Sequence, residues 1–126
     1  QASALAIIGL KPCLNYSDRL DWGTFHADTR PIGGDPIGTV TWLDDINVVP
    51  DRAGFYVWEV YINGKVLPGG GGAITKDDNL HGALPHYMNG KQVYSYGDTF
   101  HIEILHEATS GQHYAALDNR CTIAAH

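Results

Sequence analysis

The sequence predicts an all-β fold, an antiparallel β-sandwich, and three observations support this prediction. Apolar and polar residues alternate with a period of two along several short segments, which is typical of half-buried strands. Asn-Gly and Ser-Gly pairs separate such segments, where tight hairpin turns are expected. The result is about seven to nine strands at short spacing, as a sandwich requires. Only residues 1–8 have a composition that favours a helix.

The clearest strand is predicted at Phe55–Ile62. Its even-numbered residues are aromatic or aliphatic, and they alternate with a set that includes Glu59. Because burying the Glu59 carboxylate would be costly, we expect the even-numbered set to face the core. Asn63-Gly64 follows directly and predicts a hairpin, with Lys65–Leu67 as the returning strand. The residues predicted to line the core are Tyr56, Trp58, Val60 and Ile62.

The remaining strands are shorter, and further turns are expected at Asn89-Gly90 and Ser110-Gly111. The segments rich in proline and glycine, 31–36 and 69–72, are predicted loops. Without a repeat or a linker, the chain is expected to form a single domain over residues 1–126, with a short N-terminal segment. The other predicted strands are Thr39–Trp42, Ile46–Val49, Tyr87–Met88, Lys91–Tyr94, Thr99–Leu105, Gln112–Leu117 and Cys121–Ala124.

Composition limits the functional classes. Hydrophobic residues make up 44% of the 126 residues and charged residues 17%, a balance that favours a folded globule. No segment approaches the roughly 18 consecutive apolar residues that span a bilayer, so membrane insertion is not expected. The formal net charge is −6, and the eight Lys and Arg residues are scattered. Without a basic patch, nucleic acid is not an expected partner.

The two cysteines, Cys13 and Cys121, lie near opposite ends of the chain, which excludes a CxxC motif. They form either one disulfide or two buried thiols, and the disulfide is the preferred prediction. Such a bond would contribute about 4 to 5 kcal/mol in the chain-entropy model and would imply an oxidising compartment. Two features agree with secretion. The chain begins at Gln1, as a signal-cleaved product would, and Asn15-Tyr16-Ser17 is a glycosylation sequon.

Seven histidines raise the question of metal or acid–base chemistry. Their spacings match no zinc motif, so no metal site is expected. A ribonuclease needs an acid, a base and a cation, and Glu59, Glu103, His101 and Arg120 are residues of these types. The negative net charge opposes RNA binding, however. No Gly-x-Ser-x-Gly segment is present, so the motifs do not support a serine hydrolase.

Trp22 is the aromatic residue most suggestive of a binding site. It lies in Asp21-Trp22-Gly23, within a polar stretch that is interpreted as loop-like. Aromatic side chains in such positions commonly contact ligands, with polar neighbours that orient them. The alternative is that Trp22 only packs against the core.

The order of these elements resembles that of the fungal immunomodulatory proteins, small mushroom proteins with lectin-like behaviour. The longest similar segment, YVWEVYING at Tyr56–Gly64, parallels YTYRVAVSG in that family, and TVTW at Thr39–Trp42 is similar to TVTF. The other similar segments are Ser3–Leu5, Leu14 and Tyr16 followed by Trp22-Gly23, and Tyr96–Thr99 with the strand after it.

This resemblance implies an immunoglobulin-like, fibronectin III-type sandwich. It also implies homodimers formed through the N-terminal segment, carbohydrate binding and stimulation of immune cells. A proposed sugar-binding tryptophan of the family corresponds to Trp22, and a threonine that begins a late strand corresponds to Thr99. The family's C-terminal tryptophan has no counterpart in residues 114–119, and Gly9 and Pro12 interrupt the segment expected to dimerise.

We therefore expect a secreted lectin-like protein without a cofactor, whose ligand is a glycan or a cell-surface glycoprotein. Trp22 and Thr99 are the predicted ligand-binding residues. Two alternatives remain open. One is a small secreted ribonuclease-like enzyme, and the other is a protein-binding effector or toxin without a sugar site.

Overall fold

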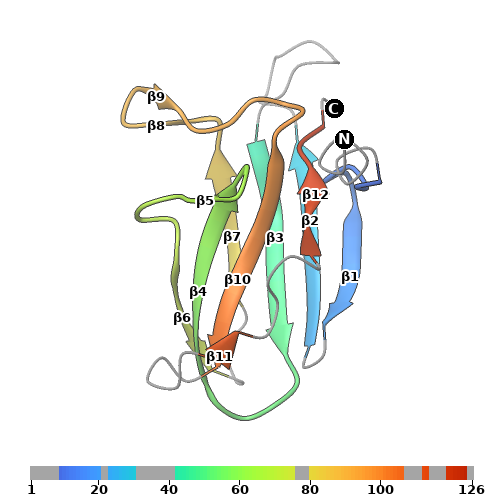
Figure 1. Cartoon of the computed structure of the whole chain (residues 1–126), viewed down its shortest axis with the longest axis vertical. Coiled ribbons are helices and arrows are strands. Elements are labelled where there is room, and N and C mark those ends of the chain that lie inside the picture. The colour runs from blue at the N-terminus through green and yellow to red at the C-terminus, as the bar shows by residue number, and fades with distance from the viewer. Residues whose placement is uncertain are drawn as a thin grey trace.

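The computed structural model describes residues 9–20, 23–30, 42–75, 80–106, 112–113 and 119–124. Within these ranges the regular structure is almost entirely β, and the strands form two antiparallel sheets and one small hairpin (Figure 1). The predicted all-β sandwich is thereby confirmed. The helix predicted at residues 1–8, the loop at 31–36 and residues 39–41 and 114–117 of two predicted strands lie outside the described residues.

The first sheet has the strand order β1-β2-β3-β7, and neighbouring strands run antiparallel. Its register is interrupted twice by irregularities, once in β2 between His26 and Asp28 and once in β3 between Leu43 and Ile46. Its strands are β1 Tyr16–Leu20, β2 Gly23–Arg30, β3 Trp42–Pro50 and β7 Leu80–Pro85.

The second sheet is built around two long central strands, β4 and β10, which pair along almost their whole length. The short strands β5 and β6 pair with the other side of β4, while β11 and β12 pair with β10. Its strands are β4 Phe55–Ile62, β5 Lys65–Val66, β6 Gly72–Thr75, β10 Thr99–His106, β11 Gln112–His113 and β12 Cys121–Thr122. The separate hairpin consists of β8 Tyr87–Met88 and β9 Lys91–Gln92.

The two Asn-Gly turns form as predicted. All four of their residues have positive φ, 53° and 78° at Asn63-Gly64 and 53° and 76° at Asn89-Gly90. This is the backbone geometry that two-residue hairpins require.

The core lies between the two sheets and takes side chains from both. Phe25 of the first sheet stacks on Phe100 of the second, with ring centroids 6.3 Å apart. The predicted core face of β4 is confirmed, because Tyr56 and Val60 are buried while Trp58 and Ile62 pack against the core. The remaining buried apolar residues include Leu20, Ala27, Leu43, Ile46, Val48, Leu84, Ile102, Ile104 and Ile123.

The predicted disulfide between Cys13 and Cys121 is present, with the two Cα atoms 5.2 Å apart. Cys13 precedes the first strand rather than lying in it. Its N–H donates to the carbonyl of Thr122 in β12, and its own carbonyl accepts from the N–H of Thr29 in β2. The segment around Cys13 therefore joins the two sheets through hydrogen bonds as well as through the covalent bond.

Several sequence-based assignments are wrong. The residues on both sides of Trp22 form β1 and β2 instead of a loop-like stretch, although Trp22 itself lies outside the described residues. Gly72, assigned to a loop, begins β6. Trp42 and the predicted strand Ile46–Val49 belong to one strand, β3, whose irregularity at Asp44 and Asp45 breaks the alternation that defines strands in a sequence.

Candidate functional site

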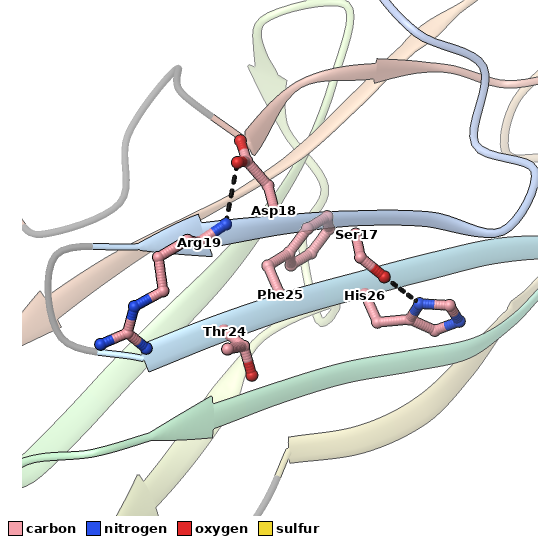
Figure 2. A pocket seen from close by; sticks show the side chains of 6 residues that line it. All are labelled: Ser17, Asp18, Arg19, Thr24, Phe25 and His26. Carbon is pink, nitrogen blue, oxygen red and sulfur yellow. Dashed lines mark hydrogen bonds between the residues drawn. The ribbon is translucent and has the colours of Figure 1, made fainter.

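A hollow of about 450 Å³ lies on the outer face of β1 and β2 (Figure 2). Because Tyr16, Leu20 and Phe25 point into the core, their neighbours in each strand point outwards. Pairing of the strands places Ser17 opposite His26, and Arg19 opposite Thr24. The residues that line the hollow are Ser17, Asp18, Arg19, Thr24, Phe25 and His26.

The guanidinium of Arg19 is fixed at the end of the hairpin. Its Nη1 donates to the carbonyl oxygen of Gly23 at 2.7 Å, and its Nη2 forms an ion pair with Asp51 at 2.6 Å. Arg19 therefore holds its position in the hollow beside the ends of β1 and β2 that flank residues 21 and 22. The predicted ligand-binding residue Trp22 belongs to this connection and lies outside the described residues.

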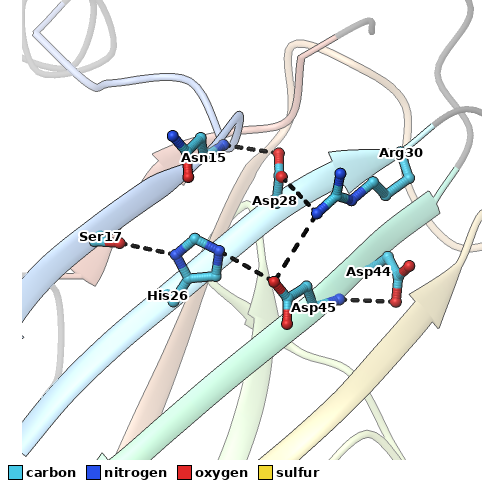
Figure 3. Close-up of polar contacts among 7 residues, drawn as sticks. All are labelled: Asn15, Ser17, His26, Asp28, Arg30, Asp44 and Asp45. Atoms are coloured by element: carbon cyan, nitrogen blue, oxygen red, sulfur yellow. Dashed lines mark hydrogen bonds and ion pairs between the residues drawn. The ribbon is translucent and has the colours of Figure 1, made fainter.

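A chain of polar contacts leads from the hollow across β2 to β3 (Figure 3). Ser17 Oγ lies 2.8 Å from His26 Nδ1, and His26 Nε2 lies 3.4 Å from Asp45 Oδ2. Arg30 Nη2 lies 4.0 Å from the same Asp45 oxygen and 3.1 Å from Asp28 Oδ2. The imidazole of His26 thus stands between a hydroxyl and a carboxylate.

The position of Asp45 depends on the irregularity in β3. Asp45 has a φ of 54°, and its N–H donates to the Asp44 carboxylate at 2.8 Å. This bulge-like geometry directs the Asp45 carboxylate towards His26, and such irregularities are frequent beside functional sites. The spacing of Ser17, His26 and Asp45 in the sequence does not mark them as a common site. The one signal in the sequence was the polar pair Asp44-Asp45 inside an otherwise alternating apolar segment.

The structure brings together three of the four residues proposed for a ribonuclease. Glu59 lies directly opposite Glu103 on the neighbouring strands β4 and β10, and Tyr61 lies opposite His101. His101 Nε2 is 3.3 Å from Glu103 Oε2, and the Tyr61 ring stacks on the His101 ring at 4.9 Å. The Tyr61 hydroxyl donates to Glu59 at 3.4 Å.

Burial shifts the pKa of two members of this cluster, His101 and Tyr61. It lowers the pKa of His101, an effect that the Glu103 carboxylate opposes and that Arg120, the fourth proposed residue, reinforces. Burial also raises the pKa of Tyr61, and the negative charges of Glu103 and Glu59 raise it further. Because His101 is only 1% exposed, its imidazole is shielded from a ligand at the surface. The geometry therefore favours a structural role for His101.

Thr99, the second predicted ligand-binding residue, is hydrogen-bonded to Asn63 of the Asn63-Gly64 turn. Its N–H donates to Asn63 Oδ1, and its carbonyl accepts from the Asn63 N–H, both at 2.9 Å. It begins β10 at the upper end of Figure 1, whereas β1 ends and β2 begins at the lower end. Thr99 therefore does not line the hollow described above.

Asn15 of the predicted sequon is exposed and directly precedes β1. Its backbone N–H donates to Asp28 Oδ1 at 2.7 Å. The Asn15 side chain takes part in none of the polar contacts drawn in Figure 3. The structure therefore places the sequon at the surface, beside the hollow.

A second hollow, of about 530 Å³, is mainly apolar and lies between β4, β5 and β6. Trp58, which the alternation assigned to the core, also lines this hollow together with Leu67 and Pro68. Among the described residues, no group of three or more His, Cys, Asp or Glu side chains is placed to hold a metal ion.

No helix in the described part of the chain is long and apolar enough to cross a membrane.

Comparisons with protein-family models, with curated proteins and with solved structures gave no match. The resemblance to the fungal immunomodulatory proteins and the immunoglobulin-like type of the sandwich therefore stay predictions.

Proposed function

We propose that this chain is a secreted, lectin-like protein that binds a glycan or a cell-surface glycoprotein through the outer face of β1 and β2. The observation that supports this proposal is the hollow, with polar residues in its lining, on the two strands that Trp22 connects in the sequence. A ligand in this hollow would meet polar side chains from both strands, with Trp22 close by along the chain.

The chemistry of the hollow suits a sugar. Sugar hydroxyls both donate and accept hydrogen bonds, so a site for them needs both kinds of partner. Ser17 and Thr24 supply hydroxyls that can do either, and Arg19 supplies donors. An aromatic ring beside such groups provides a face for stacking, and we assign this role to Trp22.

Secretion is the second part of the proposal. The Cys13–Cys121 disulfide supports it, because such bonds persist in oxidising compartments. The exposed sequon at Asn15 is compatible with the secretory route. Homodimers and stimulation of immune cells rest on the family resemblance alone, and they are further expectations of the same proposal.

The experiment is a glycan array followed by titration calorimetry with the best-bound sugar. We expect Trp22→Ala to abolish binding. Thr24→Val, which keeps the shape of the side chain but loses a hydroxyl, should weaken binding about fivefold, as expected for one hydrogen bond of about 1 kcal/mol. Tyr87→Ala is the matched control, because Tyr87 is 58% exposed and lies in the separate β8–β9 hairpin.

Thr99→Ala separates the hollow from the site implied by the family resemblance. Retained binding in this variant supports the hollow, and lost binding moves the site to the opposite end of the sandwich. Equal binding by the wild type and Trp22→Ala contradicts the assigned site. Failure to bind any sugar removes the lectin proposal and leaves a protein-binding effector as the alternative.

A further inference from the structure

We propose that Ser17, His26 and Asp45 form a catalytic triad that hydrolyses carboxylic esters bound in the hollow on β1 and β2. This activity goes beyond glycan binding and does not depend on it. Three strands contribute one residue each: Ser17 lies in β1, His26 in β2 and Asp45 in β3.

The contacts assign a role to each side chain. A carboxylate only accepts hydrogen bonds, so the His26 tautomer with its proton on Nε2 is stabilised by Asp45, 3.4 Å away. The lone pair of Nδ1 then faces Ser17 Oγ at 2.8 Å, ready to accept the hydroxyl proton. A nucleophile, a base and a group that orients the base are thus connected in sequence. The longer contact, to Asp45, is of a kind that often tightens only when substrate is bound.

The site is accessible and firmly supported. Ser17 is exposed, and the side chains of His26 and Asp45 are 27% and 40% exposed, so both an ester and water can reach them. Direct cross-strand pairing positions Ser17 against His26. Asp45 is held by the irregularity in β3 and by its contact with Arg30. Triads recur on unrelated folds and are recognised by the geometry and roles of their residues rather than by a sequence motif. Here the serine faces Nδ1 and the carboxylate faces Nε2, the reverse of the arrangement in serine proteases.

The reaction would proceed in two steps. Ser17 Oγ attacks the ester carbonyl carbon while its proton passes to His26 Nδ1, and a negative charge develops on the carbonyl oxygen. The bond to the alcohol oxygen breaks, and the alcohol leaves with the proton from His26, so that Ser17 is acylated. Water then attacks the acyl carbon, with His26 as base again, and releases the carboxylic acid and free Ser17.

The developing oxyanion needs a donor, and two side chains in the same hollow can supply one. Thr24 and Arg19 both line it, and the Arg19 guanidinium has N–H donors beyond those that it gives to Gly23 and Asp51. These donors lie on an open surface, so we expect slower turnover than at a buried oxyanion site. A hollow of about 450 Å³ suits short acyl groups, such as the acetyl esters that decorate glycans.

The experiment combines active-site labelling with a rate measurement on the full chain. A fluorophosphonate probe, located by peptide mass spectrometry, should modify Ser17. Hydrolysis of p-nitrophenyl acetate should be abolished in Ser17→Ala. It should fall roughly 10²- to 10⁴-fold in His26→Gln, the usual contribution of a general base. Asp45→Asn should lower the rate and change its pH profile, because it alters how the imidazole is oriented.

Two controls isolate the triad. Ser17→Ala also destroys the sequon, so Asn15→Gln, which removes the sequon but keeps Ser17, should retain full activity. Ser95→Ala should have no effect, because Ser95 is exposed but bonds to Gln92 rather than to a histidine. Circular dichroism of each variant checks that the fold is intact.

Hydrolysis by Ser17→Ala at the wild-type rate, or absence of label on Ser17, would overturn the proposal. The outcome is independent of the glycan proposal. A Trp22→Ala variant that loses sugar binding but keeps p-nitrophenyl acetate hydrolysis supports both proposals. A wild-type protein that hydrolyses the ester and binds no sugar supports the triad alone.

Discussion

At the scale of single residues, Tyr94 shows how one polar group completes the pairing of two strands. Its hydroxyl accepts from the N–H of Leu43 at 2.8 Å and donates to the carbonyl of Leu84 at 2.7 Å. Leu43 and Leu84 are register partners in β3 and β7, next to the irregularity in β3. The phenol therefore satisfies two buried backbone groups near the point where the regular ladder is interrupted.

Removing this hydroxyl should destabilise the fold. Tyr94→Phe leaves the Leu43 N–H and the Leu84 carbonyl without their shared partner, which should cost about 1 to 3 kcal/mol of the free energy of unfolding. Urea denaturation measures this loss. Tyr87→Phe is the matched control, because it removes a hydroxyl from an exposed ring. Similar stability of the two variants would contradict the role given to Tyr94.

The same phenol predicts an alkaline limit of stability. Burial raises the pKa of Tyr94 from 10.0 to about 12. Because the folded value lies above the unfolded one, this contribution is fully present below pH 10 and is lost as the pH rises towards 12. The wild type should therefore lose more stability than Tyr94→Phe between pH 9 and pH 11. Equal losses in the two proteins would argue against this assignment.

His101 predicts an acid limit. Burial lowers its pKa below the ordinary value of 6.5, so the unfolded chain takes up a proton that the folded chain resists. Stability is then highest above pH 6.5 and decreases as the pH falls below it. His101→Phe keeps a ring to stack on Tyr61 but removes the titration. Urea denaturation at pH 7.5 and pH 5.0 should give a smaller loss for the variant, whereas parallel losses would refute the prediction.

At the scale of elements, β6 depends on glycines that let it approach β4. A Cβ on Gly71 would lie 2.2 Å from the carbonyl oxygen of Trp58, and a Cβ on Gly72 would lie 3.0 Å from Trp58 Nε1. Gly71 and Gly72, from the glycine run assigned to a loop, are therefore required for close pairing of backbones, a common reason for glycine in or near a strand. This close approach also shapes the apolar hollow that Trp58 lines.

Gly71→Ala should separate β6 from β4. The overlap involves backbone atoms that cannot rotate away, so we expect a loss of about 1 to 3 kcal/mol, the usual cost of overpacking. Thermal unfolding followed by circular dichroism measures the effect. Gly82→Ala is the matched control, because a Cβ at Gly82 in β7 meets nothing within 4 Å. A Gly71→Ala protein as stable as this control would show that β6 can shift freely.

At the scale of the whole molecule, the two sheets are connected covalently as well as by their core. The Cys13–Cys121 bond closes a loop with a sequence separation of 108, and both residues are fully buried. Close to Cys121 in the sequence, the buried side chain of Asn119 forms hydrogen bonds with the β10 backbone, as a neighbouring strand would. Its Oδ1 accepts from the N–H of Ile102 at 3.0 Å, and its Nδ2 donates to the Ile102 carbonyl at 2.7 Å. The C-terminal end of the described chain thus contributes to closing the sandwich.

Removing the disulfide should therefore lower global stability. In a Cys13→Ser, Cys121→Ser double variant, we expect a loss of about 2 to 5 kcal/mol, because the unfolded chain regains the freedom that the long loop closure had removed. Urea denaturation with and without reductant measures it. Reductant should destabilise the wild type and leave the double variant unchanged. Insensitivity of both proteins would mean that the bond does not contribute.

Much of the second sheet was predictable, while parts of the first were not. The bounds of β4 and the Asn63-Gly64 turn agree with the prediction, because β4 alternates without interruption along its length. In β2, the irregularity after His26 leaves Ala27, Asp28 and Thr29 buried in succession, which hides the period of two. Of the proposed triad, His26 and Asp45 lie at the two irregularities, and the separations of the three residues along the chain correspond to no motif.

The β class, the core face of β4, the Asn-Gly turns and the preference for a disulfide can all be predicted from the amino-acid sequence. Each of these follows from chemistry that acts over a few residues or, for the cysteines, from their number. The contacts among Ser17, His26 and Asp45 across three strands, and the position of Thr99 away from them, follow only from the folded structure. The reason is that strand register and the irregularity at Asp45 are set by packing between distant segments, and a shift of one residue would turn each of these side chains to the other face.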